Sequence, residues 1–257
     1  MSARKWISTM SDTSLDLEQI EKDLIDLNNG VLTVTGRLVD ASNATLYAMC
    51  SVKSSDGDRE FPCIYKPIAG ERPLWDFPDG SLANREYLTF LLSHWLNLHL
   101  VPPTILRDGP YGTGMVQKWI DIDPDVDLMD LYQRNDPKLR RLALLDIIAN
   151  NTDRKIGHLI PTTGGHIYGC DHGVTFHVDD KLRTVLWQWA GSAFSEEEKD
   201  LLMRARELFA VEKREIIAGL IEEEEIFATI NRIDRALIEE TFPVPNPDWP
   251  SVPWPPF

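Results

Sequence analysis

The sequence predicts an α+β fold of two lobes, in which an N-terminal lobe rich in antiparallel strands precedes a mainly helical C-terminal lobe. Strand-like runs bounded by turn-forming residues dominate the first half of the chain, and apolar residues at helical spacing dominate the second half. The 257 residues are enough to bury a substantial core. We expect residues 1–120 to form the N-lobe, with a hinge at its end, and residues 121–257 to form the C-lobe.

The N-lobe is expected to begin with a helix and an antiparallel meander. Leu17, Ile20, Leu24 and Leu27 recur at helical spacing, and Gly30 follows where a helix C-terminal glycine is common. Turn-forming residues then separate three strand-like runs. The expected strands are residues 31–39, 44–52, 60–68, 101–107 and 114–120, with a second helix over residues 82–98.

The C-lobe is expected to be built from helices around two polar loops. An amphipathic helix over residues 137–148 leads into the first loop. A further helix begins at Ser195, because Ser195 and Glu198 form a capping-box pattern, and helical spacing continues with breaks to about residue 240. The tail, residues 243–257, is rich in Pro and Trp, so we expect it to be extended. We expect it to pack back onto this lobe, and binding of a partner is the alternative.

The composition is that of an ordinary globular protein, with 43% hydrophobic and 26% charged residues. The formal net charge of -15 predicts repulsion from nucleic acid and, less strongly, from anionic lipid. No run approaches about 20 apolar residues, and residues 7–12 are not the apolar core of a signal peptide. We therefore expect a cytoplasmic protein with no nucleic-acid partner and no integral membrane association.

The cysteines predict neither a disulfide framework nor a structural zinc site. Cys50, Cys63 and Cys170 are odd in number and lack CxxC spacing. The histidines near Cys170 likewise fit no familiar four-ligand pattern. We expect reduced thiols in the core.

Two polar loops separated by a short apolar stretch are the main chemical signal. The first loop, residues 149–158, contains Asp153, and the second, residues 168–173, contains Asp171. One Asp can orient a hydroxyl, and another can hold a divalent cation against ATP phosphates. The spacing predicts a loop, a β-hairpin and a second loop that meet in one cleft. Asp146, in the preceding helix, is expected to be structural.

Lys66 and Glu86 complete the pattern. Lys66 lies at the end of the third expected strand, where a kinase places the lysine that pairs with ATP phosphates. Glu86 lies on the following helix, where a kinase places the glutamate that holds this lysine. Either residue alone would be interpreted as a solvated surface charge, but the two loops downstream favour a functional pair.

Taken in this order, the motifs resemble those of the atypical kinases of the phosphatidylinositol 3- and 4-kinase superfamily, which include the HipA-type protein kinases. The resemblance covers roughly residues 31 to 200 and is strongest to an uncharacterised actinobacterial branch. It implies a two-lobed, protein-kinase-like fold with ATP between the lobes. It also implies that Asp153 is the catalytic carboxylate and that Asp171 binds the metal; a β-turn role is the structural alternative for Asp171.

His158 departs from the family pattern. Related kinases usually have a metal-binding Asn at this position, and His is a softer, titratable ligand. The cofactors implied are therefore ATP with magnesium or manganese, the metal held by Asp171 and His158.

The nucleotide contacts are less distinctive. The turn before residue 46 lacks glycine, but Ser42, Asn43 and Thr45 offer donors to phosphate oxygens; an ordinary hairpin turn is the alternative. Gln117 and Trp119 lie where a hinge would pair with adenine, and Trp119 would flank the base or close the core between the lobes.

The predicted function is an ATP-dependent phosphotransferase that moves the γ-phosphoryl group to a hydroxyl of a protein or small-molecule acceptor. One alternative is a nucleotide-binding pseudokinase that acts as a regulator or scaffold, with His158 and the glycine-free turn as marks of lost activity. Another is an enzyme that transfers the adenylyl group on the same fold.

Overall fold

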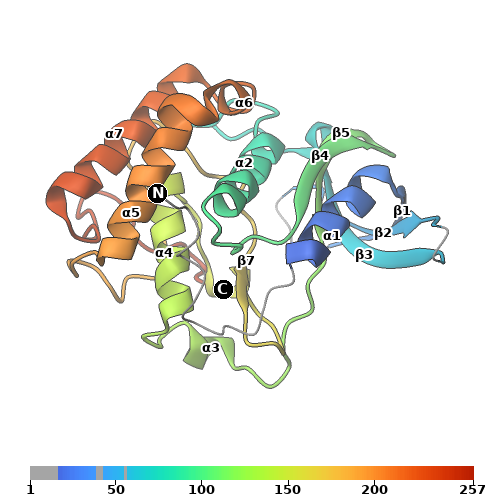
Figure 1. Ribbon diagram of the computed structural model, residues 1–257, viewed down its shortest axis with the longest axis horizontal. Coiled ribbons are helices and arrows are strands. Elements are labelled where there is room, and N and C mark those ends of the chain that lie inside the picture. The colour runs from blue at the N-terminus through green and yellow to red at the C-terminus, as the bar shows by residue number, and fades with distance from the viewer. Residues whose placement is uncertain (1–16, 39–42, 55–56) are drawn as a thin grey trace, which may run out of the picture.

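The computed structural model describes residues 17–38, 43–54 and 57–257. One end of the molecule contains a five-stranded antiparallel sheet of order β1-β2-β3-β5-β4, and the other end is mainly helical (Figure 1). The strands are β1 (Val31–Arg37), β2 (Leu46–Val52), β3 (Arg59–Pro67), β4 (Thr104–Gly109) and β5 (Gly112–Lys118). The predicted α+β class with two lobes is confirmed.

Helix α1 (Leu17–Asn29) covers one face of the sheet. Leu27 packs there with the inward side chains of the strands, among them Cys50, Cys63 and Tyr65, in a small separate core. The chain turns sharply from α1 into β1 at Gly30, where an added Cβ would lie 2.3 Å from the Cys50 Sγ. The close approach of helix and sheet therefore requires glycine at this position.

The larger hydrophobic core belongs to the helical lobe but includes one element from the first half of the chain. Helix α2 (Leu82–Trp95) contributes Leu88, Phe90 and Leu92 to it. The remaining elements are α3 (Leu128–Leu131), α4 (Pro137–Ala149), the hairpin β6 (Leu159–Pro161) and β7 (Ile167–Gly169), α5 (Glu196–Glu207), a π-helical turn (Leu208–Glu212), α6 (Arg214–Ala218), α7 (Glu223–Glu239) and two 3-10 turns (Ile68–Gly70 and Ile156–His158). Helix α2 thus lies between the two lobes, because it also packs against β4 and β5 of the sheet. The domain boundary at residue 120 stays a prediction.

The predicted helices and strands are present, and their ends shift for identifiable reasons. The helix expected to reach residue 98 ends at Trp95, because Asn97 and His99 adopt positive φ angles. The strand expected from residue 101 begins only at Thr104, because Pro102 and Pro103 have no N–H to donate to a neighbouring strand. The first strand ends at Arg37, and residue 39 lies outside the described part of the chain.

The helical start at Ser195 is confirmed as a capping box. Its hydroxyl accepts from the Glu198 N–H at 3.2 Å, and its own N–H donates to the Glu198 carboxylate at 2.7 Å. This satisfies two backbone donors that a helix N-terminus leaves unpaired.

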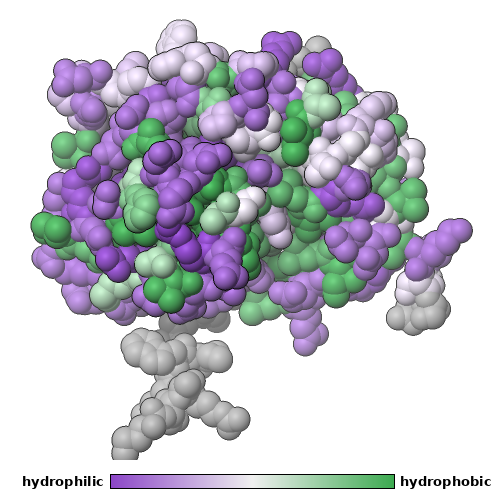
Figure 2. All heavy atoms as spheres, turned by 90° about the horizontal axis from the view of Figure 1, so that it is seen from above, coloured by the Kyte–Doolittle hydropathy of each residue, from purple (hydrophilic) through white to green (hydrophobic). Residues whose placement is uncertain are grey.

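The tail packs back onto the C-lobe, as expected. The Ser251 carbonyl accepts from the Thr184 N–H at 3.0 Å and from the Trp187 indole at 2.9 Å, and the Pro256 carbonyl accepts from the Ile156 N–H at 2.8 Å. Across the described residues, no helix has the length and apolar character needed to span a membrane. Figure 2 shows one face of the molecule, on which hydrophilic and hydrophobic residues are interspersed.

Candidate active site

Lys66 is the centre of the site. It lies near the end of β3, in the middle of the sheet, and its Nζ donates to Glu86 Oε1 at 2.5 Å and to Asp171 Oδ1 at 2.9 Å. Glu86 comes from α2 and Asp171 from the loop after β7, so three distant chain segments meet at one ammonium group. The Glu86 side chain is only 2% exposed, whereas that of Asp171 is 52% exposed. The buried carboxylate therefore fixes the lysine, and the carboxylate of Asp171 is open to solvent.

The charges of this cluster are mutually reinforcing. Burial lowers the pKa of Lys66, but the carboxylates of Asp171 and Glu86 outweigh burial and raise it. In turn, the Lys66 ammonium holds the pKa of Asp171 well below its usual range. Lys66 is therefore protonated and Asp171 ionised at neutral pH, which is the state needed to hold phosphate oxygens and a cation, respectively.

The backbone around Asp171 directs its carboxylate toward Lys66. Asp171 has a φ of 59°, a conformation that non-glycine residues rarely adopt. The loop is held on both sides, because the Cys170 N–H donates to the His158 carbonyl at 3.1 Å and the His172 N–H donates to Glu86 Oε2 at 2.9 Å. Glu86 thus connects the lysine to the backbone of this loop.

His158 lies beside Asp171, as the sequence predicted for a shared metal site. Its Nε2 is 3.5 Å from Asp171 Oδ2, and its Nδ1 accepts from the Lys155 N–H at 3.4 Å. Burial lowers the pKa of His158 to about 4, so the ring is neutral at neutral pH and carries its proton on Nε2 in this arrangement. Binding a metal through Nε2 would require the proton to move to Nδ1 and the contact with Lys155 to break.

Asp171 and His158 are the side chains that would hold a cation shared with phosphate. Within the described ranges no three His, Cys, Asp or Glu side chains form a metal cluster. Magnesium in kinase sites is commonly held by one or two protein carboxylates together with substrate phosphates and water. Asp171 would supply the carboxylate for such a cation, and His158 would join it only after the proton on its Nε2 moves.

Asp153 is positioned by the end of α4. Asn150 terminates that helix in a left-handed conformation, and the Asn151 carboxamide accepts from the Asp153 N–H at 3.0 Å. The Asp153 carboxylate lies 3.4 Å from the Arg183 guanidinium and 3.5 Å from the Lys155 ammonium. Burial raises the pKa of Asp153, Lys155 and Arg183 oppose this effect, and Asp171 adds to it. A carboxylate with a raised pKa accepts a proton more readily.

A buried ion pair connects the two polar loops. Arg154, which is fully buried, donates Nε to Asp146 Oδ2 at 2.9 Å and Nη2 to Asp146 Oδ1 at 2.8 Å. Its Nη1 donates to the Cys170 carbonyl at 2.9 Å, next to Asp171. Asp146 therefore has the structural role expected from the sequence: it holds Arg154, which in turn holds the loop of Asp171.

His172, which the sequence suggested could orient this loop, completes the buried polar network. Its Nε2 lies 2.5 Å from Arg154 Nη2, and because a guanidinium only donates, Nε2 accepts. The proton then lies on Nδ1, which is buried and has no hydrogen-bond partner among the described residues. Burial also lowers the pKa of His172, which keeps the ring neutral.

The three residues predicted to contact phosphate, Ser42, Asn43 and Thr45, differ in where the structure places them. Ser42 lies outside the described residues. The Asn43 side-chain oxygen accepts from the Arg72 N–H at 2.8 Å, so this end of the carboxamide is used within the protein. Thr45 is buried and directly precedes Leu46, which pairs with Tyr65; it therefore lies beside the Lys66 end of β3.

Sheet register identifies side chains on the same face as Lys66. Ile64, two residues before Lys66, pairs with Tyr47 on one side and with Gln117 on the other, and partnered residues share a face. Tyr47 and Ile64 thus join the predicted Gln117 as candidates for lining a base site. The Gln117 side chain is buried and donates to Thr104 Oγ1 at 2.9 Å, so it shapes the wall and is not free to read the base.

The hinge segment is partly committed to the sheet. The Trp119 N–H donates to the Pro62 carbonyl at 3.1 Å, and the Lys118 N–H donates to the Pro103 carbonyl at 2.9 Å. The Trp119 ring packs edge-on against Tyr47, with ring centroids 5.4 Å apart. Pairing of adenine with this segment therefore requires backbone groups other than these two N–H groups.

The arrangement is that of a two-lobed, kinase-like protein. It combines a lysine on the third strand of the sheet, a glutamate on the next helix, and aspartates in two loops of the helical lobe. No family model matches the chain. The chain is 40% identical over 266 residues to Protein Rv2133c of Mycobacterium tuberculosis (strain ATCC 25618 / H37Rv), covering 90% of this chain and 94% of that protein. It belongs to the family of that protein.

One solved structure aligns with this chain at low similarity. The Helicobacter pylori proinflammatory kinase CtkA aligns with a TM-score of 0.46 and 12% identity, covering 82% of this chain and 92% of that one. This similarity is too low to assign a fold or an activity.

Proposed function

We propose that the chain is an ATP-dependent phosphotransferase of the phosphatidylinositol 3-/4-kinase-like group that phosphorylates a hydroxyl of a protein or small-molecule acceptor. The observation that carries the proposal is the contact of Lys66 with both Glu86 and Asp171. In protein kinases the equivalent lysine–glutamate pair and the metal-binding aspartate must both be in place for transfer. Magnesium or manganese, held by Asp171 and His158, would neutralise phosphate charge when bound.

Each side chain of the site then has a defined task. Lys66 is a fixed cation for ATP phosphates, because Glu86 holds it from the buried side. The sheet face with Tyr47 and Ile64 would contact the base. Asp153 would orient the acceptor hydroxyl, and its raised pKa suits it to accept the hydroxyl proton.

The proposed step is an in-line displacement. The acceptor oxygen forms a bond to the γ-phosphorus while the bond from that phosphorus to the β–γ bridging oxygen breaks, and ADP leaves with the bond's electron pair. The hydroxyl proton passes to Asp153. Lys155 and Arg183, both close to the Asp153 carboxylate, are placed to stabilise negative charge on the acceptor side.

The test is incubation of the purified chain with γ-labelled ATP and either metal, scoring label on the protein, on added acceptors and in free phosphate. We expect metal-dependent transfer that falls at least about 100-fold in Asp153→Asn and Asp171→Asn. Asp200→Asn, an exposed carboxylate on α5 with the same chemical change, is the matched control. Transfer that persists in Asp153→Asn would refute the assignment of that residue, and label from α-labelled ATP on the product would indicate adenylyl transfer instead.

One observation favours a second candidate, a nucleotide-binding pseudokinase. His158 is neutral and points a protonated Nε2 at Asp171, so the donor set in this arrangement is poorer than a carboxylate with an Asn carbonyl. Saturable ATP binding with no turnover under either metal, and no gain of turnover in His158→Asn, would support this candidate over the enzyme.

A further inference from the structure

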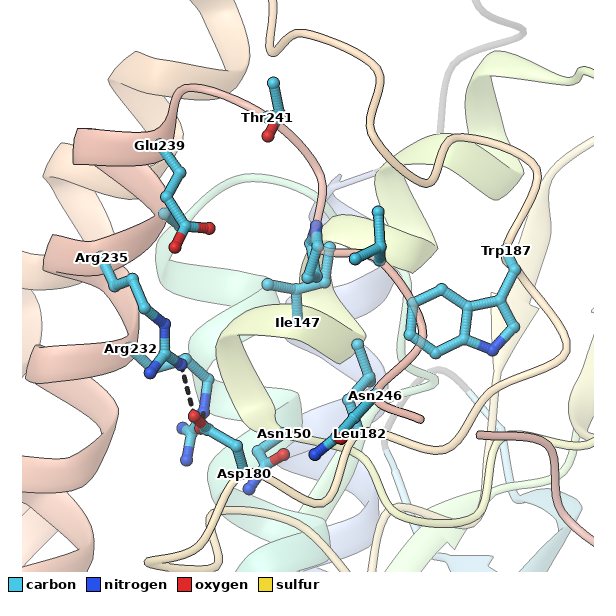
Figure 3. A pocket seen from close by; sticks show the side chains of 13 residues that line it. Ile147, Asn150, Asp180, Leu182, Trp187, Arg232, Arg235, Glu239, Thr241 and Asn246 are labelled. Carbon is cyan, nitrogen blue, oxygen red and sulfur yellow. Dashed lines mark hydrogen bonds and ion pairs between the residues drawn. The ribbon is translucent and has the colours of Figure 1, made fainter. Parts of the chain in front are cut away.

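The C-terminal tail, residues 243–257, contacts both chain segments that hold the cations near Asp153. It follows α7 and first meets the segment of residues 180–187, where Asn246 of the tail and Leu182 line the same pocket (Figure 3). Further along, it reaches the polar loop that carries Asp153. The tail therefore lies beside charged groups that the proposed function uses.

The tail holds the backbone on both sides of Arg183. The Trp249 indole N–H donates to the Lys181 carbonyl at 3.2 Å, and the Trp249 ring centroid lies 5.5 Å from the Lys181 ammonium. On the other side of Arg183, the Thr184 N–H donates to the Ser251 carbonyl at 3.0 Å. These contacts fix the direction in which the Arg183 side chain leaves the backbone.

The Arg183 side chain connects this segment to the polar loop. Its Nε donates to the Thr152 carbonyl at 2.8 Å, and its Nη2 lies 3.4 Å from Asp153 Oδ1. A contact of 3.4 Å is long for a charge-assisted hydrogen bond, so a small shift of the Arg183 backbone would break it. The position of that backbone therefore decides whether the guanidinium stays near the Asp153 carboxylate.

The end of the tail also contacts the polar loop directly. The Pro256 carbonyl accepts from the Ile156 N–H at 2.8 Å. Ile156 follows Lys155, whose ammonium lies 3.5 Å from Asp153 Oδ2. The tail thus binds the backbone beside both cations that lie near Asp153.

We propose that Trp249 is a positioning residue of the phosphotransfer site, which fixes the Arg183 backbone and thereby holds the guanidinium near the Asp153 carboxylate. This inference rests on the proposed function, because Arg183 has a task only if a hydroxyl is phosphorylated beside Asp153. Trp249 contacts neither the proposed nucleotide site nor the Asp153 carboxylate. Its loss should lower kcat and leave the KM for ATP unchanged, since ATP phosphates are expected at Lys66.

The test follows transfer of label from γ-labelled ATP to casein, to the chain itself and to water. Trp249→Ala should lower kcat about fivefold, the size expected when one partly exposed charge contact is displaced. Arg183→Gln should lower kcat by a similar factor. In the Arg183→Gln background Trp249→Ala should have no further effect, because its target is already removed. Trp254→Ala, the same change at an 89% exposed Trp of the same tail, is the matched control and should leave kcat unchanged.

The outcomes separate this inference from the function on which it rests. No transfer by the wild-type chain would refute both. Wild-type transfer with an unchanged kcat in Trp249→Ala would overturn the role of Trp249 alone. A loss that multiplies with that of Arg183→Gln would also overturn it, because Trp249 would then act on the fold in general and not through Arg183.

A second variant covers the case in which Trp249→Ala does not fold, as judged by the loss of a cooperative thermal transition. Trp249→Phe keeps an aromatic ring over Lys181 and removes only the N–H that donates to the Lys181 carbonyl. It should lower kcat about threefold, again with no further effect in the Arg183→Gln background. An unchanged kcat in this variant would overturn the proposal.

Discussion

Asp146→Asn should destabilise the protein strongly, because it removes the carboxylate that neutralises a fully buried arginine. Asp146 is 1% exposed and Arg154 is 0% exposed on their side chains, so neither charge is solvated by water. The substitution preserves the shape of the side chain, removes its charge and replaces one acceptor oxygen with an NH2 donor. Arg154 would keep its bonds to the Cys170 carbonyl and to His172, both uncharged partners.

The expected loss is roughly 3–5 kcal/mol in the free energy of unfolding, the usual result of removing one partner from a buried ion pair. It would be measured by urea unfolding followed by tryptophan fluorescence, with Asp200→Asn as the exposed control that should stay within about 0.5 kcal/mol of wild type. The double variant Asp146→Asn/Arg154→Met should lose less than the sum of the single variants, because it leaves no unpaired charge. A loss below about 1 kcal/mol in Asp146→Asn would refute the argument that this pair is energetically isolated from solvent.

Three further predictions concern the candidate active site. Glu86→Gln should reduce phosphate transfer at least about tenfold while leaving the protein folded, because Lys66 loses its buried ion-pair partner. Single-turnover transfer from γ-labelled ATP measures this rate. An unchanged rate would count against a role for the Lys66–Glu86 pair. The folded-state pKa of His158, about 4, lies below the ordinary 6.5, so the unfolded chain binds the extra proton first and stability should fall as pH drops from about 6.5 to about 4. Urea midpoints across that window should vary less steeply in His158→Asn, and an identical slope would contradict the assignment. Because the pKa of Asp153 is raised, kcat/KM should rise with pH on its acidic side with an apparent pKa above the ordinary carboxylate value of 3.8. An apparent pKa at 3.8 would argue against Asp153 as the proton acceptor.

Local patterns in the sequence identified most secondary structure but not which lobe each element packs with. Alternation and turn chemistry gave the strands, and the capping box gave the start of α5, because those signals depend on neighbours within a few residues. The packing of α2 into the larger core was not predictable, because an apolar helix carries no mark of which lobe it will contact.

In the candidate site, too, some residues could be identified from the sequence and others could not. Lys66, Glu86 and Asp171 were identifiable from the order of motifs, and the structure brings them within hydrogen-bond distance. Tyr47 and Ile64 were missed because their place on the Lys66 face follows from sheet register, which a single strand does not specify. Lys155, two positions after Asp153, was visible in the sequence as a neighbouring cation. The approach of Arg183, thirty residues after Asp153, depends on how the loop folds and was not visible.

The position of Glu86 depends on the helical lobe as much as on the sheet. The preceding residue, Arg85, is fully buried, and its guanidinium pairs with Glu225 of α7 at 2.6 Å and donates to the Thr175 carbonyl at 2.7 Å. Adjacent residues of one helix thus face opposite lobes, since Glu86 holds Lys66 of the sheet while Arg85 holds α7. A rigid helix transmits the position of either contact to the other. The lysine–glutamate pair is therefore held from both lobes, because the helix that carries Glu86 is fixed to α7 through Arg85.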